Sequence, residues 1–306
     1  KRDWSSDVCS SDLALNSRIV NHLEGWWDAP PRLVDDWQDA PVMDRWVREA
    51  AALRAEVLPG ERWLLKDPRV SLILPLWRRA VLDRCAAVLM VRDPLEVAWS
   101  LSLRNGIPLT TGLALWAAYN RAALDGLNGL PVLVCHYDRL VGDPAGVLTE
   151  AATALVGWGE LDADHPAIET AAATIRPDLR RTTWRRDAPD AIERPADIDA
   201  LAALLASLAG AHDALAAKPT PVGAWEEAIL DERRVRYGEI ARARNARDRE
   251  RERHERLEAS LAARLDANRE ALAASREATR ARSAELMQSR SEEHTSELQS
   301  RFGISY

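Results

Sequence analysis

The chain has 306 residues, a formal net charge of −7 and 29% charged residues. This mildly acidic balance argues against a broad nucleic-acid-binding surface. The sequence contains no run of about eighteen or more apolar residues, so it shows no transmembrane segment. This absence does not decide the localisation, and a cytoplasmic protein is a separate expectation.

The two ends of the chain have the sequence of a translated DNA oligonucleotide. Residues 3–13 back-translate to a DNA sequence whose reverse complement, in another frame, encodes residues 290–300. The oligonucleotide resembles a sequencing-library adapter, and residues 301–306 fit the same adapter read onward. We therefore expect residues 1–13 and 290–306 to be non-native and leave them out of arguments about the fold. Each end carries two basic and three acidic residues, so the remaining chain has a net charge of −5.

Apolar segments and helical patterns alternate along the first half of the remaining chain. Helices are predicted at 14–29, 42–57, 70–84, 93–105, 109–127 and 144–157, and buried strands at 63–65, 86–91 and 131–135. Pro75 lies inside the third helix, so its first turn is predicted to be irregular. The alternation favours an α/β fold with a mostly parallel sheet and helices on both faces.

The helix after Arg92 has the most complete set of boundary signals. Asp93 is a good N-cap, and Pro94 is preferred at the first helical position. Glu96 completes a capping box with Asp93. Asn105-Gly106 supplies a C-terminal stop.

A cation, an aspartate and a proline follow two of the predicted strands, as Lys66-Asp67-Pro68 and as Arg92-Asp93-Pro94. Each order places a cation beside a helix N-terminus at the carboxyl edge of a sheet, where α/β folds hold phosphate and sulfate groups. Lys66 is one of three lysines in a chain whose other cations are arginines. This suggests a task for a compact ammonium, although chance is the alternative. We call these two segments, Lys66-Asp67-Pro68 and Arg92-Asp93-Pro94, the two corners. Together they suggest one anionic ligand that is bound at both ends.

The second half of the chain is predicted to be largely helical. Residues 160–215 are rich in Ala and Asp and contain an irregular Arg-rich piece at 176–186. Residues 216–223 are predicted to be a linker after a domain at 14–215. Residues 224–289 form one long helical pattern.

The long helical pattern has two parts of different character. Residues 247–256 alternate Arg with Glu and Asp, which is typical of a solvated helix with i,i+4 ion pairs. Leu265, Leu272 and Leu286 then recur at multiples of seven, interrupted by Thr279. This is a weak coiled-coil seam, which leaves open a dimer or an isolated stalk helix.

Three cysteines occur, of which Cys9 lies in the excluded N-terminal piece. Cys85 and Cys135 are surrounded by apolar residues. We predict two buried core thiols rather than a disulfide framework.

Three motifs together resemble the bacterial sulfotransferases that use 3′-phosphoadenosine 5′-phosphosulfate (PAPS). They are WLLKDPR at 63–69, RDPLEVAWSL at 92–101 and HYDRLVGDP at 136–144, and the resemblance covers about residues 14–150. It implies a P-loop-like sheet and transfer of a sulfuryl group from PAPS to a hydroxyl or amine. Proteins of this kind modify carbohydrates, lipids and small metabolites, and the sequence does not choose among these acceptors. The resemblance implies no metal.

The resemblance also implies roles for individual residues. Arg92 and Ser100 match the pair that binds the 3′-phosphate, and an Arg can fork a phosphate with two hydrogen bonds. Tyr137 matches a residue that contacts the adenine. Lys66 matches the lysine that stabilises the sulfuryl group in transit. As alternatives, Arg92 pairs with a sheet-edge acid such as Asp138, or Ser100 only packs.

The general base stays open. Where many cytosolic members of the family have a catalytic His, this chain has Pro68. Asp67 is the nearest carboxylate and is our candidate, with His136 or a group in a missing N-terminal piece as alternatives. Trp26 and Trp27 either line the acceptor site or form a helix-end cluster.

The family's first strand, its phosphosulfate-binding loop and the following helix have no counterpart in residues 14–289. That loop holds the 5′-phosphosulfate with backbone N–H groups. We therefore expect a fragment, truncated at both ends, with weak or no transferase activity. Two other classes stay open: a P-loop phosphotransferase using ATP, and a non-catalytic scaffold that dimerises through its C-terminal helix.

Overall fold

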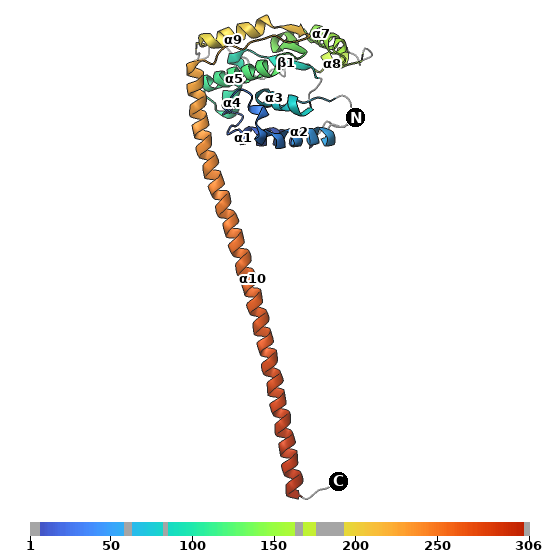
Figure 1. The fold of residues 1–306 in the computed structure, drawn as a ribbon, viewed down its shortest axis with the longest axis vertical. Helices are drawn as coiled ribbons and strands as arrows, with labels where there is room; N and C mark the ends of the chain where they lie inside the picture. The colour runs from blue at the N-terminus through green and yellow to red at the C-terminus, as the bar shows by residue number, and fades with distance from the viewer. Residues whose placement is uncertain (1–6, 58–62, 82–84, 163–167, 176–192, 303–306) are drawn as a thin grey trace. The chain divides into compact units, whose positions relative to one another are not determined.

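The computed structural model describes residues 7–57, 63–81, 85–162, 168–175 and 193–302. It is an α/β structure, mainly helical, with one small sheet (Figure 1). Contacts divide the chain into two compact units, Lys1–Glu239 and Ile240–Tyr306. Within the described ranges, no helix combines the length and apolar character needed to cross a membrane. The predicted Arg-rich irregular piece at 176–186 lies outside the described residues.

The sheet has three strands in the order β1-β2-β3. β1 (Ala87–Val91) runs parallel to β2 (Val132–His136), and β3 (Gly210–His212) pairs antiparallel with β2. The strands predicted at 86–91 and 131–135 are confirmed to within one residue. β3 was not predicted, because three residues that begin with a glycine carry no strand periodicity. The sheet is therefore mixed, and the prediction of a mostly parallel, P-loop-like sheet is confirmed only as an α/β arrangement.

The strand predicted at 63–65 is wrong. The structure has irregular chain from Trp63 to Asp67, and within the described residues no strand lies beside it. Its apolar side chains are used in other ways, since Leu65 packs against the core and the Arg54 guanidinium lies 5.2 Å from the centre of the Trp63 ring. Leu64 is 74% exposed. An apolar run without a neighbouring strand has no ladder to join.

Most helices lie where the sequence patterns predict them. The described helices are α1 (Asp7–His22), α2 (Asp44–Val57), α3 (Val70–Val81), α4 (Pro94–Asn105), α5 (Leu109–Leu127), α6 (Tyr137–Gly142), α7 (Pro144–Gly157), α8 (Ile168–Ala172), α9 (Ala196–Ser207) and α10 (Ala224–Phe302). Short 3-10 turns at Trp37–Asp39 and Pro41–Met43 precede α2. The irregular first turn of α3 is confirmed, because Ile73 has φ −124° and ψ 19°.

The helix predicted at 14–29 ends earlier, at His22. Glu24 has a left-handed backbone with φ 60°, and the N–H of Gly25 bonds back to the carbonyl of Val20. A Cβ at Gly25 would lie 2.5 Å from Cδ of Pro31, so only glycine fits this close approach. The chain therefore turns here, and Trp26 and Trp27 leave the helix.

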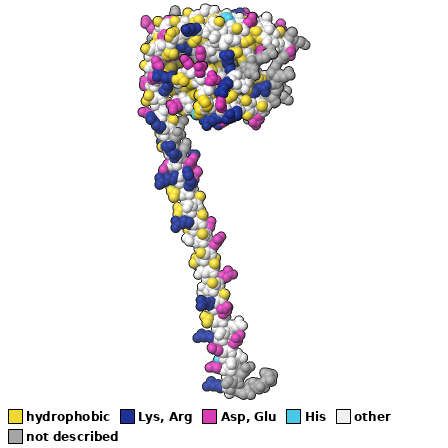
Figure 2. Space-filling model, in the orientation of Figure 1, with side chains coloured by type: hydrophobic (Ala, Val, Ile, Leu, Met, Phe, Trp, Pro, Cys, Tyr) yellow, Lys and Arg dark blue, Asp and Glu magenta, His cyan; other side chains and the backbone are white. Residues whose placement is uncertain are grey.

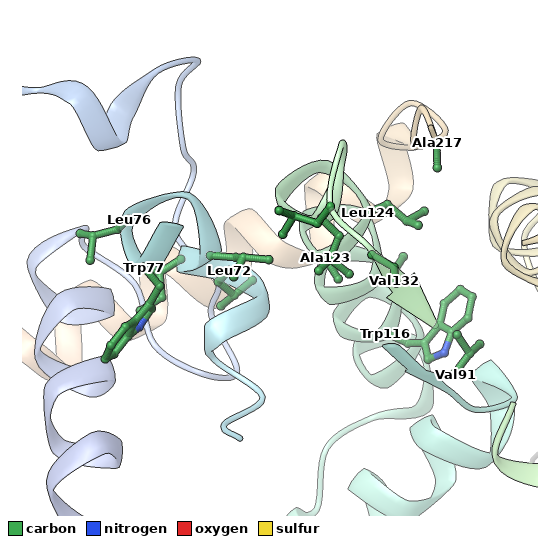
Figure 3. Packing of buried hydrophobic residues seen from close by; sticks show 14 of the residues in the cluster. Leu72, Leu76, Trp77, Val91, Trp116, Ala123, Leu124, Val132 and Ala217 are labelled. Carbon is green, nitrogen blue, oxygen red and sulfur yellow. The ribbon is translucent and has the colours of Figure 1, made fainter. Parts of the chain in front are cut away.

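Helix α5 is the centre of the first unit. It packs against α4 and α3, and α3 packs in turn against α2 and α1 (Figure 1). Cα of Ala98 in α4 lies only 2.7 Å from where a Cβ of Gly112 would stand, so glycine permits the close contact of α4 with α5. Figure 3 shows core side chains from α3, α5 and the two parallel strands, among them Leu72, Trp77, Trp116, Leu124, Val91 and Val132.

The segment predicted as a linker, 216–223, and the first turns of α10 belong to the first unit. Arg121 Nε of α5 donates to the carbonyl of Thr220 at 2.9 Å, and the Trp26 ring stacks on Tyr237 of α10 at 5.8 Å. The long helix predicted from 224 is confirmed. Figure 2 shows charged side chains of both signs along this helix.

Cys85 and Cys135 are both free thiols, Cys135 buried and Cys85 half-buried. Burial raises the pKa of both thiols. The prediction of a buried core thiol is confirmed for Cys135, whereas Cys85 is half-buried, and neither forms a disulfide.

Candidate functional site

The parallel pairing of β1 and β2 assembles the candidate site at their carboxyl ends. Val91 lies opposite His136, so Arg92 and Tyr137 leave adjacent strands at the same edge. The Arg92 guanidinium carbon lies 4.8 Å from the centre of the Tyr137 ring. The structure thus brings together two residues predicted to bind one cofactor, although they are 45 positions apart in the chain. A cation on an aromatic face is a favourable contact.

Helix α4 begins at this edge with the predicted cap. The Asp93 carboxylate accepts hydrogen bonds from the N–H groups of Leu95 and Glu96 at 2.9 and 3.1 Å. The chain between β1 and α4 is held by a hydrogen bond from α5, because Trp116 Nε1 donates to the carbonyl of Arg92 at 2.9 Å. The remaining N–H groups of the first turn carry the positive end of the helix dipole. The Arg92 side chain and the N-terminus of α4 therefore lie side by side at this edge.

The charge of Arg92 is balanced in part by Glu96, an acid of the helix that follows it. Arg92 Nε donates to Oε2 of Glu96 at 3.0 Å, and the two side chains are 22% and 9% exposed. One observed partner of Arg92 is therefore Glu96, the residue assigned to the capping box. The alternative of a sheet-edge acid such as Asp138 stays a prediction. An anion arriving at Arg92 would have to share the guanidinium with Glu96 or displace it.

A third chain segment reaches the same edge. Arg194, which precedes α9, lies with Nη1 3.3 Å from Oδ2 of Asp93 and Nε 2.8 Å from Oδ1 of Asp199. The sequence analysis did not single out this residue. Its signal was weak, a cation directly before Pro195 and a helix, and its distance along the chain from Asp93 hides the contact. Among the described residues, two guanidinium groups therefore lie at this edge, those of Arg92 and Arg194.

Ser100, the second residue predicted to bind the 3′-phosphate, lies half-buried on α4, about two turns beyond the cap. In the part of the chain that the structure describes, its hydroxyl makes no polar contact with Arg92 or Tyr137. Its predicted role rests on the motif alone.

The Lys66 corner has a different architecture. The side chain of Asp67 is 1% exposed, and it accepts from Asn16 Nδ2 at 2.8 Å. Arg69 grips the same carboxylate with Nε at 3.0 Å, Nη2 at 3.0 Å and its backbone N–H at 2.9 Å. Arg69 also donates to the Ser17 hydroxyl, and Asn16 accepts from Trp77 Nε1 at 2.9 Å. Asp67 is therefore the centre of a buried polar joint between α1 and α3.

This joint removes the support for Asp67 as a general base. A carboxylate enclosed by four donors has no open position toward a substrate proton. Lys66 itself is exposed, and among the described residues the contacts that assemble the Arg92 edge do not include it. The two corners are separate in their contacts, although their sequences match.

The other predicted candidates have packing partners. His136 lies with Nε2 3.3 Å from the carbonyl of Leu205, beside α9. The carbonyl of Trp27 accepts a hydrogen bond from the Tyr119 hydroxyl at 2.7 Å, and the Trp26 ring stacks on Tyr237. Burial, and to a smaller extent the negative charge of Asp67, raises the pKa of Tyr119. These contacts support the helix-end cluster rather than an acceptor site.

A buried ion pair that the sequence analysis missed joins α5 to the start of α10. Arg121 Nη1 donates to Oε2 of Glu226, and the two side chains are 7% and 1% exposed. Arg121 Nη2 lies 4.0 Å from Asp197 Oδ2, and Trp225 Nε1 donates to both oxygens of Asp197. Burial raises the pKa of Glu226, and the nearby Arg121 opposes that shift. An arginine inside the otherwise apolar face of α5 was the available signal.

Comparison with known proteins adds no assignment. No family model matches the chain, and neither a curated protein nor a solved structure is significantly similar to it. The described residues hold no group of three or more His, Cys, Asp or Glu side chains that could bind a metal ion.

Proposed function

We propose that this chain is part of a sulfotransferase that transfers a sulfuryl group from PAPS to a hydroxyl or amine of an acceptor. The observation that carries the proposal is the register of β1 and β2, which sets Arg92 against Tyr137 beside the capped start of α4. A guanidinium, an aromatic ring and a helix N-terminus suit a phosphate next to an adenine base.

In this proposal Arg92 binds the 3′-phosphate of PAPS and Ser100 donates from the same helix. Tyr137 contacts the adenine. The Arg92 guanidinium turns part of its hydrogen bonding from Glu96 toward the phosphate, since an arginine has five N–H donors. Lys66, exposed next to the fixed Asp67 joint, stabilises charge on the sulfuryl oxygens during transfer. The base that accepts the acceptor's proton is not assigned.

The proposal is tested by calorimetric titration with 3′-phosphoadenosine 5′-phosphate, the product of the reaction. Arg92→Ala should weaken binding at least about tenfold, because a hydrogen-bonded charge pair is worth on the order of 1.5–3 kcal/mol. Arg104→Ala is the matched control, since Arg104 is an exposed arginine near the end of α4, the helix that follows Arg92. Its affinity should equal that of the unsubstituted chain. If ATP competes for the site and a 3′-phosphate on the nucleotide does not improve affinity, the result would favour a phosphotransferase and contradict the proposal.

A further inference from the structure

Helix α10 has an apolar stripe in the part that belongs to the second unit of the chain, Ile240–Tyr306. Leu257, Leu261, Leu265, Leu272 and Leu286 are each 52–63% exposed. Because an α-helix turns about 100° per residue, these five side chains fall within an arc of about 80°. Their common face was not evident from the seven-residue recurrence of three of them.

The arc that holds the leucines contains no charge between residues 257 and 286. Its other members in that range are Asn268, Ser275, Thr279 and Ser283. Ten charged residues occur in the same range, and all of them lie on the rest of the helix circumference. In a tail with charged side chains of both signs along it (Figure 2), a continuous uncharged arc is a separate surface.

The width and spacing of the stripe indicate what covers it. From Leu261 to Thr279 the members of the arc follow one another at alternating intervals of four and three residues, the spacing of a coiled-coil seam. An arc of about 80° is narrower than the apolar face by which a helix packs on a globular core or lies in a membrane interface. A seam of this width is covered by one other helix of the same kind.

We propose that the stripe from Leu257 to Leu286 binds a second copy of α10, so that two chains associate as a two-stranded coiled coil. The polar members Asn268, Ser275 and Thr279 interrupt the apolar seam and make the association weaker than that of an all-leucine zipper. Either relative orientation of the two helices buries the same leucines. The proposal does not depend on the function of the first unit.

Sedimentation equilibrium of the full chain over a wide range of micromolar concentrations tests this proposal. The unsubstituted chain should show a reversible monomer–dimer equilibrium. The double substitution Leu265→Glu and Leu272→Glu should weaken dimerisation about 100-fold or more. In the dimer it replaces four buried leucines of the seam, two from each chain, with four charged side chains. Leu265→Ala with Leu272→Ala, which keeps the helix apolar there, should give a smaller weakening.

The matched control is Ala263→Glu with Ala274→Glu. These two alanines lie on the side of the helix opposite the stripe, so the control adds the same charge and leaves the seam intact. Its dimerisation constant should stay within about twofold of the unsubstituted value. Circular dichroism of each variant separates loss of association from loss of helix.

Three results would overturn the proposal. One is a chain that stays monomeric at every concentration. Another is a dimer that both double glutamate variants weaken equally, which would place the interface elsewhere. The third is a monomer that binds anionic phospholipid vesicles and loses this binding with Leu265→Glu and Leu272→Glu, which would make the stripe a membrane-binding face.

Discussion

Two corners of this molecule have the same order of cation, aspartate and proline, and the surroundings of their aspartates are opposite. The Asp67 side chain is 1% exposed and is bonded to Asn16 and Arg69. The Asp93 side chain is 37% exposed, caps α4 and pairs with Arg194. The shared order specifies a helix start in both places. Burial makes one corner a structural joint, whereas the aspartate of the other corner stays partly exposed.

The largest difference between the corners should appear in stability. Asp67→Ala leaves Arg69 and Asn16 without their acceptor in a buried site, so it should lower the free energy of unfolding by about 3–5 kcal/mol. Urea denaturation of both variants measures this, with Asp93→Ala as the comparison. Equal losses at the two corners would show that the contrast in burial has no energetic meaning.

The Asp93 corner should show a smaller loss of stability that is joined to a loss of binding. Asp93→Ala removes an N-cap and should cost about 1 kcal/mol. Asp143 is the matched control, because it also precedes a proline and caps a helix, accepting from the N–H of Gly146 at 3.0 Å. Asp143→Ala should lower stability by a similar amount. In calorimetry, only Asp93→Ala should weaken binding of 3′-phosphoadenosine 5′-phosphate, because the Asp93 cap positions the start of α4 beside Arg92.

Removing the acid that competes for Arg92 should strengthen binding. Glu96→Gln keeps the shape of the side chain and removes its charge, so affinity for 3′-phosphoadenosine 5′-phosphate should rise by about two- to fivefold. Glu49→Gln is the control, since Glu49 pairs with Arg18 on α1. An affinity for Glu96→Gln that equals the control value would mean that Arg92 does not meet the phosphate.

Lys66→Ala should have the smallest effect. The side chain is exposed, so the free energy of unfolding should change by less than about 0.5 kcal/mol. Affinity for 3′-phosphoadenosine 5′-phosphate should be unchanged, because that ligand has no sulfuryl group. A marked loss of affinity would place Lys66 at the 3′-phosphate and merge the two corners into one site.

Local signals in the sequence predicted the helical half of this fold well. The cap at Asp93 and the stop at Gly106 follow from interactions within one turn of α4. The bounds of α5 and α7 also agree with the ranges predicted for them. The strand predicted at 63–65 was wrong because strand formation depends on a neighbour, which an apolar run cannot specify alone. β3 was missed for the opposite reason, since a short strand depends almost wholly on its partner.

The candidate site was predicted in part. The motifs placed Arg92 and Tyr137 at strand ends, and the pairing of the strands brought them together. The partners that set the charge of the edge, Glu96 and Arg194, were not foreseen as partners. Glu96 has two competing uses at the start of a helix, and Arg194 approaches from a segment about 100 positions away in sequence. Burial of Asp67 likewise follows from tertiary packing, which the order Lys-Asp-Pro does not encode.

The most direct measurement compares two ligands in two proteins. Affinities for 3′-phosphoadenosine 5′-phosphate and for adenosine 5′-monophosphate, which lacks the 3′-phosphate, are measured by calorimetry in the unsubstituted chain and in Arg92→Ala. The account predicts that the 3′-phosphate improves affinity at least about tenfold in the unsubstituted chain and gives almost no improvement in Arg92→Ala. An equal improvement in both proteins would contradict the assignment of Arg92 to the 3′-phosphate, and with it the proposed use of the corner at Arg92-Asp93-Pro94.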